Sequence, residues 1–232
     1  MKNILLIGGS YGIGLAIAKE LQYGNNVFIA SRTNENIADL NVTHIPFDAL
    51  QDTLDIAQLP AVIHGLVYCP GSINLRPFRG LKPDAFENDL QINFISMIKM
   101  IQSILPNLTA AEQSSIVLFS SVAASMGMPF HTSVAAAKGA IEGFSKALAA
   151  EYAPKIRVNV IAPSLTDTPL ADKFLNSDEK KEKSALRHPL KRVGTSDDLA
   201  QMASFLLSDK SSWISGQIFH VDGGMSTLLV NG

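Results

Sequence analysis

Short apolar segments alternate with amphipathic segments along most of this chain. The apolar segments are rich in Val, Ile, Leu and Phe, which is typical of strands that are buried on both faces of a parallel sheet. The pattern predicts strands at Asn3–Ile7, Asn26–Ala30, Thr43–Pro46, Gly65–Tyr68, Ser115–Ser120, Arg157–Ile161 and Gln217–Val221.

The segments between these strands have apolar residues at helical spacing. The predicted helices are Ile13–Leu21, Pro83–Leu105, Val134–Tyr152 and Ser196–Leu207. The last of them follows Thr195, which begins a typical helix N-cap sequence. Alternation of strand and helix predicts an α/β fold with a doubly wound parallel sheet of about seven strands and helices on both faces. Because no linker divides the chain, we expect residues 1–232 to form a single domain.

One stretch departs from this alternation. Leu170–Arg192 is polar and contains the charge-dense run Asp178–Lys183. Such a run is most often a solvated surface helix, and the alternative is a mobile lid over a site. The charge pattern alone favours the surface helix.

The composition limits the class of protein and its partners. The 232 residues include 19 Lys and Arg against 21 Asp and Glu, which gives a net charge of −2. This balance supplies no electrostatic reason to bind nucleic acid or an anionic membrane. The single cysteine, Cys69, excludes an internal disulfide framework and a multi-cysteine zinc site. No metal is expected, because four histidines lack the spacing of metal ligands: His44, His64, His188 and His220.

The N-terminus has no recognisable targeting signal. Met1–Ile7 holds only a short apolar run, whereas a signal peptide needs about 7–15 apolar residues. No run approaches the roughly 20 apolar residues that span a bilayer. We therefore expect a soluble, cytoplasmic protein.

A glycine-rich loop joins the first predicted strand to the first helix. Glycines permit a tight turn and let backbone N–H groups approach a phosphate, and the helix N-terminus adds partial positive charge. The spacing is G-x-x-x-G-x-G and not the common G-x-G-x-x-G, so the alternative is a glycine-rich turn without a ligand. The strand–loop–helix context favours a nucleotide site that includes Gly8, Ser10, Tyr11, Gly12, Ile13 and Gly14.

The end of the second strand bears on the choice of nucleotide. NAD sites commonly place Asp or Glu there to bind the ribose 2′-hydroxyl. This chain has Ser31 and Arg32 instead, and an arginine suits a 2′-phosphate. The alternative is an exposed arginine at a strand end. The residues favour NADP(H) over NAD(H).

Further motifs that match one family follow the predicted strands. They are Asp48-Ala49, Gly71, Gln91–Phe94, Ser120–Val122, Arg157–Pro163, Thr168 and Val221–Gly224. Together with the glycine loop, these motifs resemble those of the short-chain dehydrogenase/reductase family over essentially the whole chain. The resemblance implies a Rossmann-like fold and hydride transfer between a nicotinamide cofactor and a carbonyl or alcohol.

The resemblance also implies roles for individual residues. Asn93, Ser121 and Lys138 match catalytic positions of the family. The cofactor is expected to contact the glycine loop together with Ser31, Arg32, Asp48, Ala49, Gly71, Lys138, Pro163 and Thr168.

Some positions depart from the family pattern. Tyr68-Cys69-Pro70 stands where Asn-Asn-Ala is usual, and Ser164 replaces a glycine after Pro163. The central departure is in the Tyr-x-x-x-Lys signature, where Val134 precedes Lys138 on the same helix face. Valine has no ionisable proton, and a positioned general acid is worth about 10²–10⁴-fold in rate.

Other groups are candidates for the proton donor. His131 lies three residues before Val134, and histidine suits acid–base work near neutral pH, although a surface histidine in the loop after Ser121 is the alternative. Water held by Ser121, Lys138 and Asn93 is another candidate. Tyr152 is at the far end of the same predicted helix and is not expected to act.

Three functions remain open from the sequence. The leading hypothesis is an NADP(H)-dependent oxidoreductase for a carbonyl or alcohol with an atypical proton donor. The second is an NADP(H)-binding protein with little or no turnover, such as a sensor or partner subunit. The third is reduction of an activated C=C bond. Thr166–Arg192 is the expected substrate loop, and the resemblance implies a homotetramer or homodimer formed through the helices that contain Asn93 and Val134–Tyr152.

Overall fold

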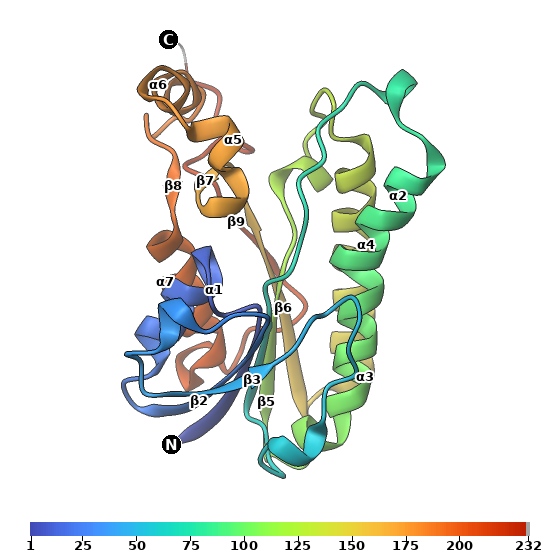
Figure 1. The fold of residues 1–232 in the computed structure, drawn as a ribbon, viewed down its shortest axis with the longest axis vertical. Helices are drawn as coiled ribbons and strands as arrows, with labels where there is room; N and C mark the ends of the chain where they lie inside the picture. The colour runs from blue at the N-terminus through green and yellow to red at the C-terminus, as the bar shows by residue number, and fades with distance from the viewer. Residues whose placement is uncertain (231–232) are drawn as a thin grey trace.

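A single parallel sheet organises the chain in the computed structural model, which describes residues 1–230 (Figure 1). Its strand order is β3-β2-β1-β4-β5-β6-β9. The predicted strands and the doubly wound α/β fold are confirmed, with strand ends that differ by a residue or two. The strands are β1 (Lys2–Ile7), β2 (Asn25–Ser31), β3 (Val42–Pro46), β4 (Gly65–Tyr68), β5 (Ser114–Phe119), β6 (Ile156–Pro163) and β9 (Ile218–Val221).

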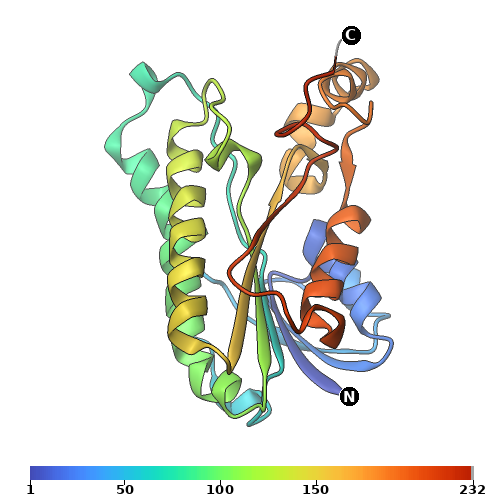
Figure 2. The same cartoon turned by 180° about the vertical axis from the view of Figure 1, so that it is seen from behind.

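Helices cover both faces of this sheet. α1 (Gly12–Leu21) and α7 (Ser196–Leu207) lie on one face, and α3 (Ser96–Thr109) and α4 (Thr132–Tyr152) lie on the other (Figures 1 and 2). Short 3-10 turns connect several elements at Glu35–Ile37, Ile56–Gln58, Phe78–Gly80, Val122–Ala124, Pro169–Ala171 and Asp209–Ser211.

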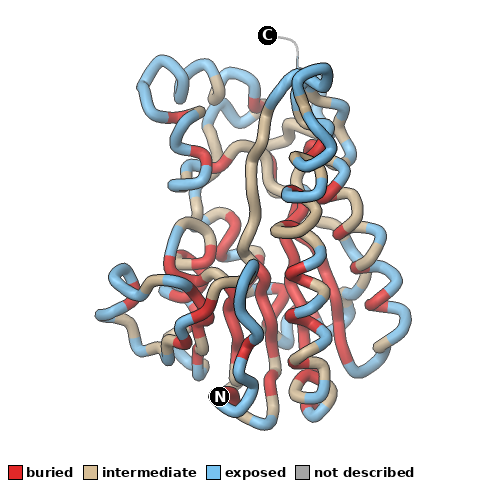
Figure 3. Tube along the Cα trace, turned by 45° about the vertical axis from the view of Figure 1, so that its right-hand side comes forward, coloured by how far each residue is buried: buried red, intermediate tan, exposed pale blue. Residues whose placement is uncertain are grey.

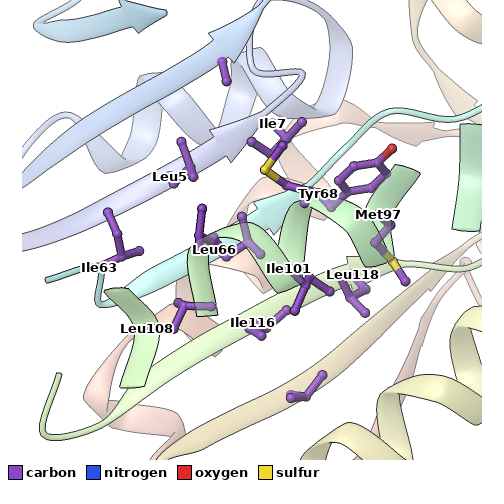
Figure 4. Packing of buried hydrophobic residues seen from close by; sticks show 14 of the residues in the cluster. Leu5, Ile7, Ile63, Leu66, Tyr68, Met97, Ile101, Leu108, Ile116 and Leu118 are labelled. Atoms are coloured by element: carbon purple, nitrogen blue, oxygen red, sulfur yellow. The ribbon is translucent and has the colours of Figure 1, made fainter. Parts of the chain in front are cut away.

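The apolar runs of the strands supply two cores. Successive side chains of a strand point to opposite faces. In β1, Leu5 and Ile7 therefore join the core under α3 and α4, while Ile4 and Leu6 join the core under α1 and α7. Figure 4 shows the first core, in which Ile101 and Leu108 of α3 lie among side chains of the strands. Burial on both faces explains why the central positions of β1, β2, β4 and β5 are apolar.

The prediction of one helix over Pro83–Leu105 is wrong in detail. The segment is divided into α2 (Pro83–Leu90), a π-helical turn at Gln91–Ile95, and α3, which continues to Thr109. The side-chain amide of Asn93 donates to the carbonyl oxygen of Asp89, 2.8 Å away, which an α-helix would reserve for the Asn93 backbone N–H. This insertion into the backbone ladder accounts for the π turn.

The charge-rich stretch folds as short elements beside the main sheet. It contains α5 (Asp172–Leu175) and α6 (Asp178–Leu186), and it is flanked by a small pair of parallel strands, β7 (Thr166–Asp167) and β8 (Gly194–Thr195). α6 buries no residue, as expected for the solvated surface helix that its charges predict. Figure 3 shows the contrast between these exposed elements and the buried strands.

Residues 1–230 contain neither a membrane-spanning helix nor a cluster of metal-ligating side chains. No described helix combines the length and apolar character that crossing a membrane requires. Within the same residues, no three or more His, Cys, Asp or Glu side chains are grouped as metal ligands.

The N-cap of α7 provides a test of the fold. Thr195 accepts a hydrogen bond from the backbone N–H of Asp198, and the Asp198 carboxylate accepts one from Thr195 N at 2.8 Å. We expect Thr195→Ala to lower the free energy of unfolding by about 1 kcal/mol in urea titrations. The matched control is Ser177→Ala, which removes the cap of α6, a helix that buries nothing. A similar loss in both variants would contradict the link between capping and core packing.

Candidate functional site

The candidate site lies where the strands β4, β5 and β6 end. Neighbouring parallel strands bring the residues after Tyr68, Phe119 and Pro163 to the same edge of the sheet. A cavity of about 350 Å³ opens there and is walled mainly by apolar side chains. Among the predicted site residues, its lining includes Ile13, Gly71, Ser121, His131, Val134, Lys138, Pro163 and Thr168.

The glycine loop lies beside this cavity and has little room for side chains. Gly8 has φ +79°, and a Cβ at Gly14 would overlap the carbonyl oxygen of Gly8. At Gly12, with φ +52°, a Cβ would come within 3.4 Å of Thr168. Tyr11 is the N-cap of α1, but its side chain makes no capping hydrogen bond. The first amides of α1 therefore have no side-chain cap, an arrangement suited to an anionic ligand.

A second group of predicted residues lies at the end of β2, outside the cavity lining. Gly8 N donates to Ala30 O at 2.8 Å, which holds the glycine loop against this strand end. The Ser31 hydroxyl donates to Thr33 O at 2.8 Å, and the Arg32 side chain is exposed. Asp48 and Ala49 are half-buried in the turn after β3. These positions extend the site from the cavity along the glycine loop.

Lys138 lies deep in the cavity wall. Its ammonium group donates to Phe119 O at 2.9 Å, and the residue is 9% exposed. Burial lowers the pKa of Lys138 from 10.5 to about 8, and the nearby Cys69 and Asp89 oppose this shift only in part. Val134, one turn earlier on α4, is buried and contributes an apolar surface to the same wall.

Ser121 follows β5 in the cavity wall and makes no hydrogen bond to a charged side chain among the described residues. Its hydroxyl oxygen accepts from Ala123 N at 3.2 Å, so its proton stays available to an acceptor in the cavity. The preceding Ser120 is committed elsewhere, because its hydroxyl donates to Glu142 at 2.6 Å. The choice of Ser121 as the candidate catalytic serine is therefore consistent with the geometry.

Asn93 is fully buried and does not line the cavity. It lies behind Gly71, where an added Cβ would be 2.9 Å from Asn93 Oδ1 and 3.4 Å from Lys138 Nζ. Its side-chain amide also donates to Ser72 Oγ at 2.9 Å. Gly71 thus allows Asn93 and Lys138 to approach each other through the loop after β4.

A buried carboxylate completes this cluster and was not predicted. Asp89 is 0% exposed and accepts hydrogen bonds from Ser72 Oγ at 2.5 Å and Asn74 Nδ2 at 2.9 Å. Its other oxygen has no hydrogen-bond partner among the described residues. The signal in the sequence is weak, because Asp89 occurs within an ordinary polar helix.

Cys69 also contributes to the cavity wall. Burial raises the pKa of its thiol to about 12, and the charge of Lys138 opposes the shift only in part. The thiol is therefore protonated near neutral pH and acts as a small apolar group.

The alternative proton donors occupy different places. His131 is the N-cap residue of α4, is half-buried in the cavity wall, and has Nδ1 2.7 Å from Pro129 O. Tyr152 is at the other end of α4, which is continuous from Thr132, and it does not line the cavity. Tyr11 is 49% exposed on the glycine loop.

Two cavity residues were not predicted as a functional pair. Ser164 Oγ lies 2.8 Å from Nε2 of His188, and both residues line the cavity. From the sequence, His188 is weighed only as a metal ligand, because no neighbouring motif connects it with Ser164. The only signal was the serine in place of the glycine that the family resemblance leads one to expect.

Comparisons with known proteins identify the family of the chain. A family model described as enoyl-(acyl carrier protein) reductase matches residues 8–226. The 3-oxoacyl-(acyl-carrier-protein) reductase FabG of Chlamydia trachomatis is 33% identical over 243 residues, 97% of each chain. The chain belongs to the short-chain dehydrogenase/reductase family.

Solved structures of this family have the same fold. A short-chain dehydrogenase/reductase of Brucella melitensis, described as a glucose/ribitol dehydrogenase, has a TM-score of 0.86 and 28% identity, over 97% of this chain and 96% of that one. A gluconate 5-dehydrogenase of Burkholderia cenocepacia, in complex with NADP and tartrate, has a TM-score of 0.89 and 25% identity, over 98% and 96%.

The buried lysine generates a prediction about stability. Between pH 8 and pH 10.5 the unfolded chain binds a proton at Lys138 that the folded chain does not. The free energy of unfolding should therefore rise with pH across this window, by about 3 kcal/mol from this residue. We expect Lys138→Met to lack that rise in urea titrations at several pH values. Lys146→Met, at an exposed position of the same helix, is the control, and parallel curves for wild type and Lys138→Met would contradict the prediction.

Proposed function

We propose that this protein is an NADP(H)-dependent oxidoreductase that interconverts a carbonyl and an alcohol and moves the substrate proton without a tyrosine. The observation that carries the proposal is the convergence of Ser121, Val134 and Lys138 on one cavity, next to an uncapped helix N-terminus. The oxidoreductases among its relatives act on chemically different substrates, so the proposal does not name one.

The glycine loop and its surroundings fit a dinucleotide. A Cβ at Gly14 would fill the turn, and the free amides at the start of α1 suit a pyrophosphate. Arg32 is exposed just after β2, next to Ser31 and Thr33, and its guanidinium would bind a 2′-phosphate there. Gly71, Pro163 and Thr168 line the cavity, where the nicotinamide would supply or accept the hydride.

The residues of the cavity suit the remaining steps. Ser121 can donate its free proton to a substrate oxygen, because its own oxygen already accepts from Ala123 N. Lys138 uses one N–H on Phe119 O, which leaves its other N–H groups for a nicotinamide ribose. Val134 stands at the position of the family's tyrosine and leaves the proton transfer to another group. His131 and a water held by Ser121 and Lys138 are candidates for that group.

A second function has its own support. Val134 supplies no proton, and the loop after β4 contains Cys69-Pro70 in place of the family pattern. Both features suit an NADP(H)-binding protein without turnover, such as a sensor or a partner subunit.

The preference for NADP(H) is tested at Arg32. We expect Arg32→Ala to weaken NADPH binding about 10–100-fold, because a charge-assisted hydrogen bond is worth roughly 1.5–3 kcal/mol. NADH binding should change little. Fluorescence titration with both nucleotides measures the effect, and Arg79→Ala controls for the loss of one exposed positive charge. Equal affinity of the wild type for NADH and NADPH would contradict the preference.

The missing hydroxyl is tested by restoring it. We expect wild type and Val134→Tyr both to oxidise NADPH with members of a broad carbonyl panel, with the variant faster by up to about 10²-fold. Val134→Phe is the matched control, since it adds the ring without the hydroxyl. Turnover by Val134→Tyr alone would instead favour the binding protein.

A further inference from the structure

A serine and a histidine form a hydrogen-bonded pair in the cavity wall. Ser164 is the first residue after β6, and His188 follows α6 in the chain. Ser164 Oγ is 2.8 Å from Nε2 of His188, and His188 is only 3% exposed. Because both residues also line the cavity, the pair has one side in protein and one side toward the space for substrate.

The hydrogen bonds of His188 fix which nitrogen can exchange a proton. Nδ1 lies 2.8 Å from the carbonyl oxygen of Ser184, which can only accept, so Nδ1 carries a hydrogen in both the neutral and the charged ring. Any change of protonation must therefore occur at Nε2, the atom that faces Ser164. The second nitrogen is held by a backbone acceptor, as in other histidines that act as acids and bases.

Ser164 has a choice of partner that matches these two states. When Nε2 has no hydrogen, the Ser164 hydroxyl donates to it at 2.8 Å. When Nε2 carries a hydrogen, it donates to Ser164 Oγ, and the serine proton is then free for another acceptor. The carbonyl oxygen of Asp222 is one such acceptor at 3.4 Å, and a substrate oxygen in the cavity is another.

The register of the sheet places the pair beside the candidate catalytic serine. β5 and β6 are neighbours, with Phe119 opposite Ile161. Continued two residues beyond the end of β5, this register would bring Ser121 opposite Pro163, next to Ser164. Neighbouring strands are about 4.8 Å apart. The Ser121 and Ser164 segments therefore border the same part of the cavity.

The segment after β9 packs against His188 and the loop that follows it. Gly223 has φ +63°, and a Cβ there would lie 3.6 Å from the Cβ of His188. Leu190 N donates to Gly223 O at 3.2 Å, which ties the loop after His188 to the segment after β9. The Asp222 carboxylate accepts from Gly224 N at 2.8 Å and so shapes the same turn. The segments that follow β6 and β9 therefore both support the Ser164–His188 pair.

From this geometry we infer that Ser164 and His188 form the proton relay that serves the substrate oxygen in place of the tyrosine. The inference rests on the oxidoreductase function proposed above. In reduction, the carbonyl carbon accepts a hydride from the reduced nicotinamide, and the C=O π pair moves to oxygen. That oxygen takes the proton of Ser164, and Ser164 Oγ takes the Nε2 proton of charged His188. In oxidation the same steps run in reverse, and neutral His188 ends with the proton. Ser164 is then a catalytic residue, and His188 acts through it.

The test compares variants that keep the loop and remove the relay. Ser164→Ala removes the hydroxyl, and His188→Asn keeps an amide that can donate to Ser184 O but has no group that ionises. We expect each to lower kcat about 10²–10³-fold. KM and the affinity for NADPH should change by no more than about twofold. The melting temperature should change by no more than a few degrees. The double variant should be no slower than the slower single variant, because both changes break one relay.

His220→Asn is the matched control, since this exposed histidine does not line the cavity, and His131→Asn tests the rival proton donor. An unchanged kcat in Ser164→Ala and His188→Asn, with kcat lost in His131→Asn, would overturn the relay and leave the oxidoreductase function intact. Wild-type protein that binds NADPH but turns over no carbonyl would overturn both the relay and the reductase, and leave only nucleotide binding. Absence of NADPH binding by the wild type would overturn the proposed function as a whole.

Discussion

The parallel pairing of β1, β4, β5 and β6 is the constraint on which the site depends. In this register Ile7 is opposite Tyr68, Tyr68 is opposite Leu118, and Phe119 is opposite Ile161. All four strands therefore end at one edge, and the loops that follow them meet there. The helices on both faces bury the strands and hold this alignment, so the loops can carry polar groups without loss of the core.

The polar groups at this edge are costly to bury, and each is held by a specific contact. Lys138 loses solvation but keeps Phe119 O as an acceptor, while the Asp89 carboxylate accepts from Ser72 and Asn74. The π turn at Asn93 brings its amide to Ser72 instead of continuing the helix. Such departures from regular structure are frequent at functional sites. Here Asn93 and Lys138 both lie next to Gly71, where a side chain would meet them.

Much of the fold could be predicted from the sequence, because the strands are buried on both faces and leave continuous apolar runs. The glycine loop and the capping residues of α7 could also be predicted, since short local patterns determine them. The π turn could not, because it depends on a side-chain hydrogen bond from Asn93 to Asp89 O. Ser164 and His188 could not be paired either, since the chain between them folds into α5 and α6 before His188 returns to the cavity.

The position of Val134 explains why a relay from the other side of the cavity is chemically reasonable. The cavity is lined by His131 at the N-cap of α4 and by Val134 and Lys138 within it, and Lys138 donates to Phe119 O. A substrate oxygen between the ends of β5 and β6 would border Ser121 and Ser164 at the same time. Ser121 has no hydrogen-bonded acid that could return a proton to it, because its oxygen accepts from the backbone amide of Ala123. Ser164 is hydrogen-bonded to the imidazole of His188, which Ser184 O orients. Of the two serines, Ser164 is therefore the one that can both give up a proton and regain it.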